Sequence, residues 1–397
     1  MRRGVLTSVA AGAVIVSAIA SLAGCASLAP GEPSGAPLPS PSGEPTPALE
    51  PGPVTPAGTP TALVTGLTSP WSILRLDDRL TSADDTAPDG TSAASTLISE
   101  RDSGAIVEYS ATGTVHEIGT VAGVVHEGEG GLLGIEAWYE GETTWIYAYL
   151  TTARDNRIVR MTLDGEPGSY SLGAEQDILT GLAKAGNHDG GRIKIGPDRM
   201  LYATVGDAGV TERAQDKNSL NGKILRMRLD GGVPDDNPFP GSLVYSMGHR
   251  NPQGLAWDAS GRLWASEFGQ NTWDELNRIE PGKNYGWPIV EGIGNKDGFV
   301  DPVYQWSTSE ASPSGLAFVR DTFFMAALRG QRLWAIYPGS QADAVAWFEG
   351  EFGRLRDAVP GPNGTLWVLT NNTDGRGTPK QGDDKLLQVR LEPLREG

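Results

Sequence analysis

A strand–turn–strand phrase that recurs about six times constrains the fold of this chain more than any other feature of its sequence. In its clearest copies, residues 191–203 and 254–265, a short apolar strand leads through a turn rich in Gly, Asp or Pro to a second strand with a Leu-Tyr or Leu-Trp pair. The phrases begin near residues 71, 134, 191, 254, 315 and 357. This spacing of roughly 40 to 60 residues is typical of four-stranded propeller blades.

The recurrence predicts an all-β fold, a six-bladed β-propeller that follows a signal peptide and a disordered linker. A β-sandwich also contains alternating strands, but it gives no reason for one phrase to return so often. In a propeller, the loops at one end of the channel converge on a single mouth. Residues far apart in the sequence are therefore expected to form one site.

The N-terminus has the pattern of an export signal. Met1-Arg2-Arg3 precedes an apolar stretch over residues 5–23, which ends in Leu-Ala-Gly before Cys25. We expect residues 1–24 to be a lipoprotein signal peptide and Cys25, the only cysteine, to carry lipid. The alternative is an uncleaved membrane anchor. Both interpretations predict an exported protein held at the extracytoplasmic face of the cell membrane.

Residues 25–60 are rich in Pro, Gly and Ser and contain few bulky apolar side chains, so they predict a disordered tether. Residues 61–397 show no second segment of this kind and predict one large domain. The net charge of −17 argues against a nucleic-acid partner, which needs clustered Lys and Arg. An anionic ligand would need a local cationic pocket.

The chain contains four histidines, and two of them, His188 and His249, lie in polar, glycine-rich loops beside the recurring strands. A loop histidine at the mouth of a propeller suits a general base, because its ordinary pKa lies near neutrality. The alternative for His188 is a structural histidine.

Five further phrases carry a family resemblance. They are NHDGGR (187–192), VGDAG (205–209), GHRNPQG (248–254), SEFGQNTWDE (266–275) and NYGWP (284–288), with GGLLG (130–134) upstream. In this order they resemble the soluble glucose, aldose and sorbosone dehydrogenases that use pyrroloquinoline quinone (PQQ). The resemblance covers most of the predicted domain.

The resemblance implies roles for individual residues. His188 matches the base that takes a proton from the anomeric hydroxyl of the sugar while hydride passes to the quinone. Arg250 and Asn251 match residues beside the reacting carbonyl of the cofactor, where Arg250 would assist catalysis. Gly269 and Gln270 match positions whose backbone carbonyls hold a calcium ion.

The resemblance also implies a cofactor site. Arg329, Arg354 and Arg356 match cationic residues that hold the carboxylates of the cofactor, and Glu129 and Thr370 match further cofactor-binding positions. The alternative for Arg354 and Arg356 is a solvated surface pair. A second calcium site is expected around Glu291 and Asn295.

The chain departs from the family pattern at several positions. Glu129, Ala208 and Phe268 stand where the family often has glutamine, and Asn187 stands where an acidic partner of the histidine is common. The leading hypothesis is an oxidoreductase that oxidises an aldose or related sugar at the anomeric carbon with PQQ and calcium. The alternatives are a non-catalytic surface propeller that binds carbohydrate or protein and a calcium-dependent, lactonase-like hydrolase. The sugar and the electron acceptor stay open.

Overall fold

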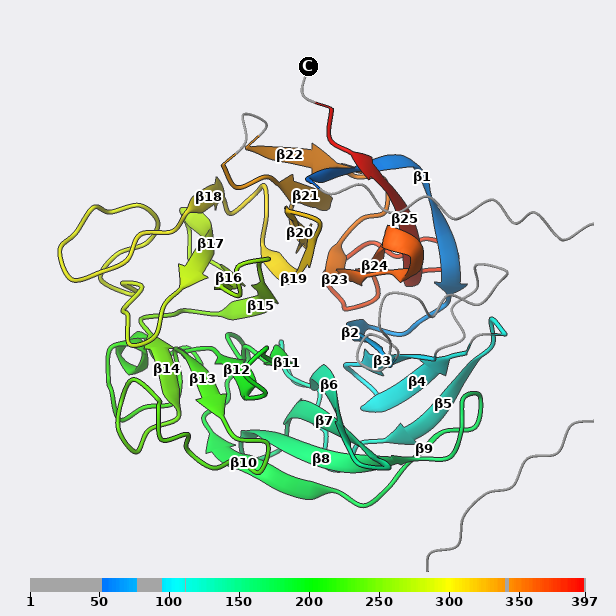
Figure 1. The fold of residues 1–397 in the computed structure, drawn as a ribbon, viewed down its shortest axis with the longest axis horizontal. Coiled ribbons are helices and arrows are strands. Elements are labelled where there is room, and N and C mark those ends of the chain that lie inside the picture. Colours follow the sequence, from blue (N-terminus) through cyan, green and yellow to red (C-terminus); the bar gives the residue numbers. More distant parts are fainter. Residues whose placement is uncertain (1–51, 77–94, 111, 340–342, 396–397) are drawn as a thin grey trace, which may run out of the picture. The chain divides into compact units, whose positions relative to one another are not determined.

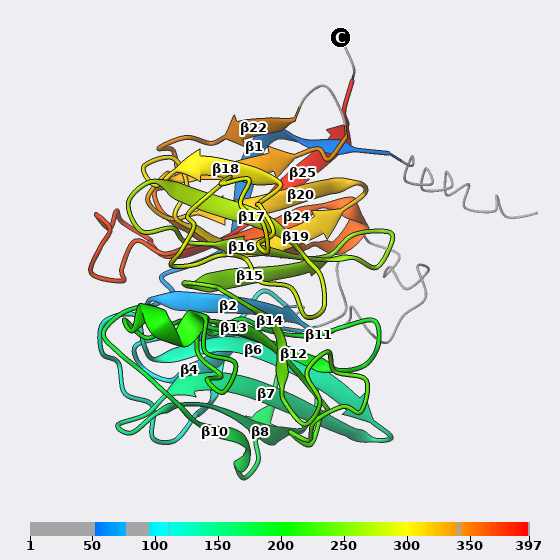
Figure 2. The same cartoon turned by 90° about the vertical axis from the view of Figure 1, so that its left-hand side faces the viewer.

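Six β-sheets surround one central axis in the computed structural model, which describes residues 52–76, 95–110, 112–339 and 343–395 (Figure 1). Each sheet is a four-stranded antiparallel blade, and the second blade has one added short strand. Seen edge-on, the ring has β2 and β15 near its middle (Figure 2). The predicted all-β, six-bladed propeller is confirmed.

The first three blades follow the chain order. Blade 1 contains β2 (Pro70–Arg75), β3 (Thr96–Glu100), β4 (Ala105–Tyr109) and β5 (Val115–Thr120). Blade 2 contains β6 (Leu132–Glu140), β7 (Thr143–Thr151), β8 (Asn156–Asp164) and β10 (Gln176–Leu182), with β9 (Ser171–Leu172) paired to β8. Blade 3 contains β11 (Ile193–Ile195), β12 (Leu201–Val205), β13 (Lys223–Met227) and β14 (Val244–Met247).

The last three blades complete the ring. Blade 4 contains β15 (Pro252–Trp257), β16 (Leu263–Glu267), β17 (Trp273–Ile279) and β18 (Tyr304–Ser307). Blade 5 contains β19 (Pro313–Val319), β20 (Thr322–Ala327), β21 (Arg332–Ile336) and β22 (Ala344–Trp347). Blade 6 contains β23 (Leu355–Pro360), β24 (Leu366–Thr370), β25 (Lys385–Pro393) and β1 (Val54–Thr65). Two short 3₁₀ turns, Thr211–Ala214 and Pro362–Gly364, lie in loops.

The inner part of each blade is buried on both faces. β12 and β20 have every residue buried, because each blade packs between two neighbours and neither face of its sheet meets water. The six predicted repeat starts fall in, or two residues before, the innermost strands β2, β6, β11, β15, β19 and β23. The recurring phrase is therefore the first hairpin of each blade.

The ring is closed by its N-terminal strand. β1 pairs antiparallel with β25, so the outermost strand of the last blade comes from the other end of the domain. The buried Val54 also donates its N–H to the Thr322 hydroxyl in blade 5 at 2.8 Å. The expected boundary between the tether and the domain, after residue 60, is wrong. Residues 54–60 belong to β1 and therefore to the domain. Prolines within that stretch are tolerated because β1 is an edge strand.

A buried ion pair fills the axis of the ring. Arg192 Nη1 lies 3.0 Å from Asp357 Oδ2, and the same guanidinium donates to the Gln253 carbonyl and lies 4.3 Å from the ring centre of Trp71. One cavity lies on the Trp71 side of this pair. A second cavity, of roughly 260 Å³, is lined by later residues of all six inner strands. The pair therefore separates the two mouths of the channel.

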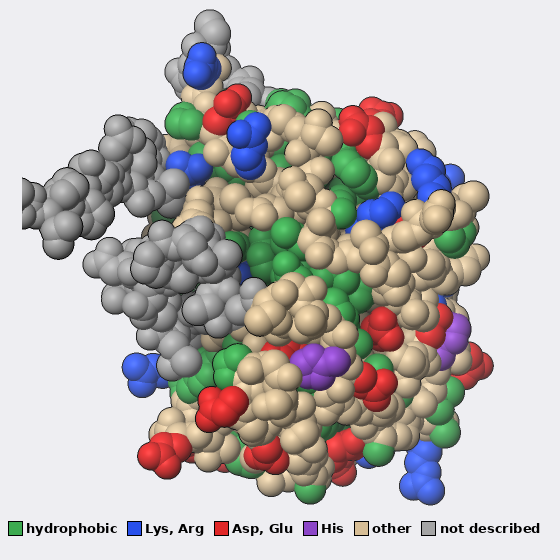
Figure 3. Space-filling view, turned by 90° about the vertical axis from the view of Figure 1, so that its right-hand side faces the viewer, with side chains coloured by type: hydrophobic (Ala, Val, Ile, Leu, Met, Phe, Trp, Pro, Cys, Tyr) green, Lys and Arg blue, Asp and Glu red, His purple; other side chains and the backbone are tan. Residues whose placement is uncertain are grey.

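Acidic and basic side chains are both visible on the side of the molecule drawn in Figure 3. On the face shown in Figure 3, the Lys and Arg side chains of the described residues stand apart from one another. No helix in the described ranges has the length and apolar character needed to cross a bilayer. The expected signal peptide and Cys25 lie outside the described residues.

Candidate functional site

One mouth of the channel holds a cavity of roughly 350 Å³ with an unusual concentration of positive charge. Six arginines line it, against two acidic side chains, Glu129 and Asp274. The arginines are Arg101, Arg250, Arg329, Arg354, Arg356 and Arg376. An acidic protein thus presents a local cationic pocket, the condition expected for holding an anionic ligand.

His188 lies at the rim of this cavity, in the loop that precedes β11. Its Nδ1 lies 2.7 Å from Asp207 Oδ1, and its backbone N–H donates to Glu129 Oε2 at 2.9 Å. A donor at Nδ1 leaves Nε2 as the proton acceptor of the neutral ring. The side chain is 12% exposed, so Asp207 and Glu129 hold it in place while it stays accessible from the cavity.

Asp207 is the acidic partner of the histidine, and the sequence analysis missed it. Asp207 also accepts hydrogen bonds from the Trp287 indole at 2.9 Å and from the Gly209 amide at 2.8 Å. Burial alone would raise the pKa of Asp207, but its contacts with His188, Trp287 and Gly209 outweigh burial and lower the pKa. The Asn187 amide nitrogen lies 3.4 Å from His188 Nε2, so Asn187 contacts the ring while Asp207 supplies the negative charge that Asn187 lacks.

Arg250 and Asn251 enter the cavity from the loop between β14 and β15. The Arg250 guanidinium lies 5.5 Å from the ring centre of Trp287, and burial lowers its pKa. Its Nε has no hydrogen-bond partner among the described residues. The Asn251 amide donates to Glu129 Oε2 at 3.3 Å and accepts the Gly190 N–H at 3.0 Å. Glu129 thus connects His188 to Asn251.

Two buried carboxyl groups lie behind Arg250. Glu267 accepts hydrogen bonds from His249 Nδ1, at 2.8 Å, and from the Arg250 backbone N–H, so His249 is structural. Glu275 stands opposite Glu267 in the β16–β17 register. Burial and the adjacent charge of Glu267 raise the pKa of Glu275 to about 8.

This raised pKa predicts a stability change with pH. An unfolded glutamate has a pKa of 4.5, so the unfolded chain releases this proton first as the pH rises toward the folded pKa of about 8. The free energy of unfolding of the metal-free protein therefore falls across that interval. Glu275→Gln removes the ionisation. The variant should raise the free energy of unfolding at both pH values. The increase near pH 8 should exceed the increase near pH 5 by at least about 1 kcal/mol. Urea unfolding at the two pH values checks this, and an equal effect at both would contradict it.

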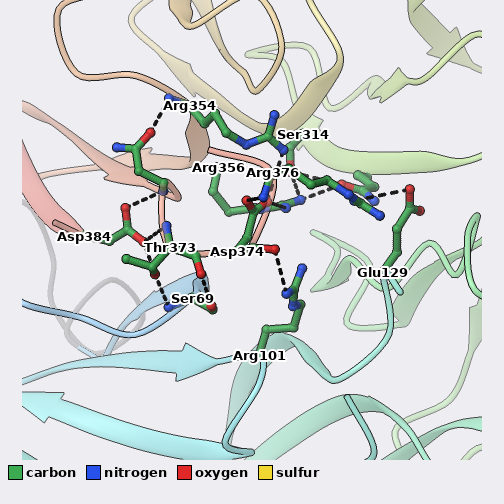
Figure 4. Close-up of polar contacts among 12 residues, drawn as sticks. Ser69, Arg101, Glu129, Ser314, Arg354, Arg356, Thr373, Asp374, Arg376 and Asp384 are labelled. Atoms are coloured by element: carbon green, nitrogen blue, oxygen red, sulfur yellow. Dashed lines mark hydrogen bonds and ion pairs between the residues drawn. The ribbon is translucent and has the colours of Figure 1, made fainter. Parts of the chain in front are cut away.

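Arg354 and Arg356 are buried in the wall of the cavity rather than solvated. Their side chains are 11% and 4% exposed, and their guanidinium groups lie 3.1 and 3.7 Å from Asp374 Oδ2 (Figure 4). The charges of both arginines outweigh burial and lower the pKa of Asp374. Burial lowers the pKa of Arg356 to about 9. The surface-pair alternative is therefore wrong.

Two further arginines of the cavity escaped the sequence analysis. Arg101 is fully buried and lies 3.4 Å from the Asp374 carbonyl, whereas Arg376 is 44% exposed and lies 3.5 Å from Glu129 (Figure 4). Both follow the second strand of a blade, as do Asp207 and Arg329. Because the second strand ends where the first begins, its following loop reaches the same mouth. That position in the repeat is the signal that could have found them.

Gly269 and Gln270 follow β16 and line the cavity. Their carbonyl oxygens accept no hydrogen bond from the described residues. Such carbonyls suit a hard cation such as calcium. The described residues contain no group of three or more His, Cys, Asp or Glu side chains arranged to hold a metal.

Glu291 and Asn295, the residues expected at a second calcium site, both take part in hydrogen bonds to or from backbone amides. Glu291 Oε1 accepts four backbone N–H groups, from residues 270–273. Burial opposes its ionisation, but these amides outweigh burial and lower the pKa of Glu291. The Asn295 backbone N–H instead binds Asp301. These contacts give the two residues separate structural roles.

Comparison with known proteins identifies the family. The sequence model described as glucose / sorbosone dehydrogenase matches residues 67–383. The chain belongs to the glucose/sorbosone dehydrogenase family. This agrees with the resemblance seen in the sequence.

Three relatives show how close the family members are. The structure titled as the PQQ-bound form of aldose sugar dehydrogenase from Streptomyces coelicolor shares 49% identity with a TM-score of 0.76, over 85% of this chain and 100% of that one. Quinoprotein glucose dehydrogenase B of Acinetobacter calcoaceticus is 32% identical over 54% of this chain and 52% of its own length. Aldose sugar dehydrogenase YliI of Escherichia coli is 35% identical over 48% of this chain and 59% of its own length. The chain thus spans about half to three-fifths of these curated relatives.

The departures from the pattern of the glucose/sorbosone dehydrogenases are unevenly placed. Glu129 and Phe268 line the cavity, whereas Ala208 is buried and its N–H donates to the His188 carbonyl. Thr370, matched to a cofactor-binding position, lies outside the cavity. Its buried hydroxyl donates to Asp384 at 2.9 Å and accepts the Lys385 N–H at 2.8 Å. Thr370 therefore does not line this cavity.

Proposed function

We propose that this protein is an oxidoreductase that oxidises an aldose or related sugar at the anomeric carbon, with PQQ as cofactor and calcium as its metal. The observation that carries the proposal is the His188–Asp207 pair, with 2.7 Å between Nδ1 and Oδ1, at the rim of a cavity lined by six arginines. The names of three relatives, a quinoprotein glucose dehydrogenase and two aldose sugar dehydrogenases, support it.

The charge of the cavity suits a molecule that carries several carboxylates. Arg329, Arg354 and Arg356 would hold those carboxylates, because guanidinium groups pair with them bidentately and keep their charge. The Nε atoms of Arg250 and Arg354 are buried without a hydrogen-bond partner among the described residues. A polar ligand would offset this cost of unmet donors.

The mechanism assigns each residue a task. Asp207 keeps the Nδ1 proton of His188 in place, so Nε2 takes the proton from the anomeric hydroxyl. The bound quinone supplies the acceptor for the hydride of the sugar. Arg250, held by Phe268 and Trp287, presents a fixed positive charge where negative charge develops on the acceptor oxygen. The carbonyls of Gly269 and Gln270 would hold the calcium ion, which would supply Lewis-acid assistance there.

Reconstitution tests the proposed function. Purified protein is incubated with PQQ and calcium chloride, passed through a gel-filtration column, and assayed with a panel of aldoses and a redox dye. We expect the absorbance of the cofactor to elute with the protein and the dye to be reduced only when sugar is present. Protein that binds no PQQ would overturn the proposal in favour of a non-catalytic surface propeller. Sugar-lactone hydrolysis that needs calcium but no PQQ would favour the hydrolase.

We also propose that the protein is exported and anchored to the cell membrane through lipid on Cys25. The small residues before this cysteine and the apolar stretch that precedes them support the assignment. Cys25→Ser should move the protein from the membrane fraction to the soluble fraction, because acyl chains supply the anchoring free energy. Fractionation followed by immunoblotting measures this. A Cys25→Ser variant that stays in the membrane fraction would show that another segment anchors the chain.

A further inference from the structure

The loop between β16 and β17 is held almost entirely by carboxylates. The N–H groups of Gln270, Asn271, Thr272 and Trp273 all donate to one oxygen, Oε1 of Glu291, at 2.7, 3.1, 3.0 and 3.2 Å. The preceding N–H, of Gly269, donates to Asp274 Oδ1 at 2.9 Å. Five consecutive amides therefore have their directions set by two side chains.

Those directions determine where the carbonyls of the loop point. The peptide bonds on both sides of Gln270 are trans, so each C=O points opposite to the N–H of the same peptide unit. The peptide units that contain the Gly269 and Gln270 carbonyls also contain the N–H groups of Gln270 and Asn271. Both of these N–H groups point at Glu291. Both carbonyl oxygens consequently face away from Glu291. Gly269 and Gln270 line the cavity, whereas Glu291 does not.

The loop leaves little space at the two glycines beside Glu291. A Cβ atom added to Gly269 would lie 1.8 Å from the Trp273 carbonyl and 2.8 Å from Glu291 Oε1. A Cβ atom on Gly292, next to Glu291, would lie 2.5 Å from the Trp273 side chain. The turn is thus closely packed beside the half-exposed Glu291, and without this carboxylate its amides would lose the acceptor that orders them.

We propose that Glu291 is the positioning residue of the calcium site: it turns the Gly269 and Gln270 carbonyls away from itself, as a preformed pair of ligands. This inference rests on the proposed function, since it concerns the calcium ion assigned there. In this role Glu291 orients the two carbonyl ligands and does not itself bind the calcium ion. Removal of such a residue weakens metal binding because the metal-free protein no longer holds the carbonyls in place. Ordering them on binding then lowers the net binding free energy.

Calcium affinity measured directly tests the inference. Calcium chloride is titrated by calorimetry into the full chain saturated with PQQ, for the wild type, Glu291→Ala and Glu291→Gln. We expect Glu291→Ala to weaken calcium binding about 10- to 100-fold. Glu291→Gln should weaken it less, since its amide oxygen still accepts N–H groups. If Glu291→Ala does not fold, the Glu291→Gln comparison decides. Calcium binding as tight as that of the wild type in the folded variants would overturn the inference.

Asp301 provides a matched control. Its carboxylate accepts the backbone N–H groups of Gly294 and Asn295 in the same surface segment, but it does not contact residues 269–273. Asp301→Asn should therefore leave calcium affinity within about threefold of the wild type. An equal loss in both variants would show general loosening of the segment and overturn the inference. Wild-type protein that binds PQQ but no calcium would instead remove the metal from the proposed function.

Discussion

Replacing His188 by glutamine should lower the turnover of sugar by about 10² to 10⁴-fold, while PQQ and calcium still bind. Glutamine keeps much of the shape of the side chain and can contact Asp207, but it cannot take a proton from the anomeric hydroxyl. The proposed cofactor and metal ligands, Arg329, Arg354, Arg356 and the carbonyls after β16, are untouched. Steady-state kinetics with reconstituted protein, alongside cofactor absorbance, measure both parts.

His116→Gln is the matched control for this variant. His116 lies on β5, at the outer edge of blade 1, where its Nε2 is 3.2 Å from Glu108. It is remote from the mouth, so its replacement should leave turnover within about twofold of the wild type. A His188→Gln protein that oxidises sugar at the wild-type rate would remove His188 from the mechanism.

Changing Arg354 and Arg356 together to alanine should abolish tight PQQ binding and also lower the free energy of unfolding of the cofactor-free protein by about 3–5 kcal/mol. The second effect follows from Asp374, whose carboxylate is buried and faces both guanidinium groups. Without them it is left in the wall of the cavity as an uncompensated charge. Urea unfolding and a titration with PQQ measure the two effects.

Two companion variants separate cofactor binding from stability. Arg329 lines the cavity but is exposed and makes no ion pair with a described residue, so Arg329→Ala should weaken PQQ binding and leave stability unchanged. Adding Asp374→Asn to the double variant should restore most of the lost unfolding free energy, since the charge is removed, but it should not restore PQQ binding. Full stability of the double alanine variant would contradict the role assigned to Asp374.

The recurring hairpin made the fold predictable, because both of its strands are buried and apolar and are joined by a short turn. β1 was missed because its partner, β25, lies at the opposite end of the domain and its own residues are those of a linker. Nothing in residues 54–60 alternates between apolar and polar side chains. That segment forms a strand because it pairs with β25 and so closes the ring.

The residues of the candidate site that belong to sequence motifs were predictable. Those whose role depends on contacts in the folded chain were not. His188, Arg250 and Gly269 belong to such phrases, and the structure places all three at the cavity. Asp207 also stood in a phrase, but its bond to His188 depends on how two loops meet at the mouth. The contacts of Thr370 and Glu291 were not predictable for the same reason. A hydroxyl or carboxylate that suits a ligand also suits a backbone amide, and only the packing determines which it meets.

The buried pair of Arg192 and Asp357 has a kinetic consequence. It closes the channel below Trp71, so the cavity is entered and left through the same mouth. If the proposed function holds, a sugar bound at that mouth would occupy the space through which an electron acceptor has to approach. Under the proposed function, the oxidised product would have to leave before the acceptor arrives, and the two half-reactions would alternate as in a ping-pong scheme. Either partner in excess would then obstruct the other, and the rate would depend on the balance between them.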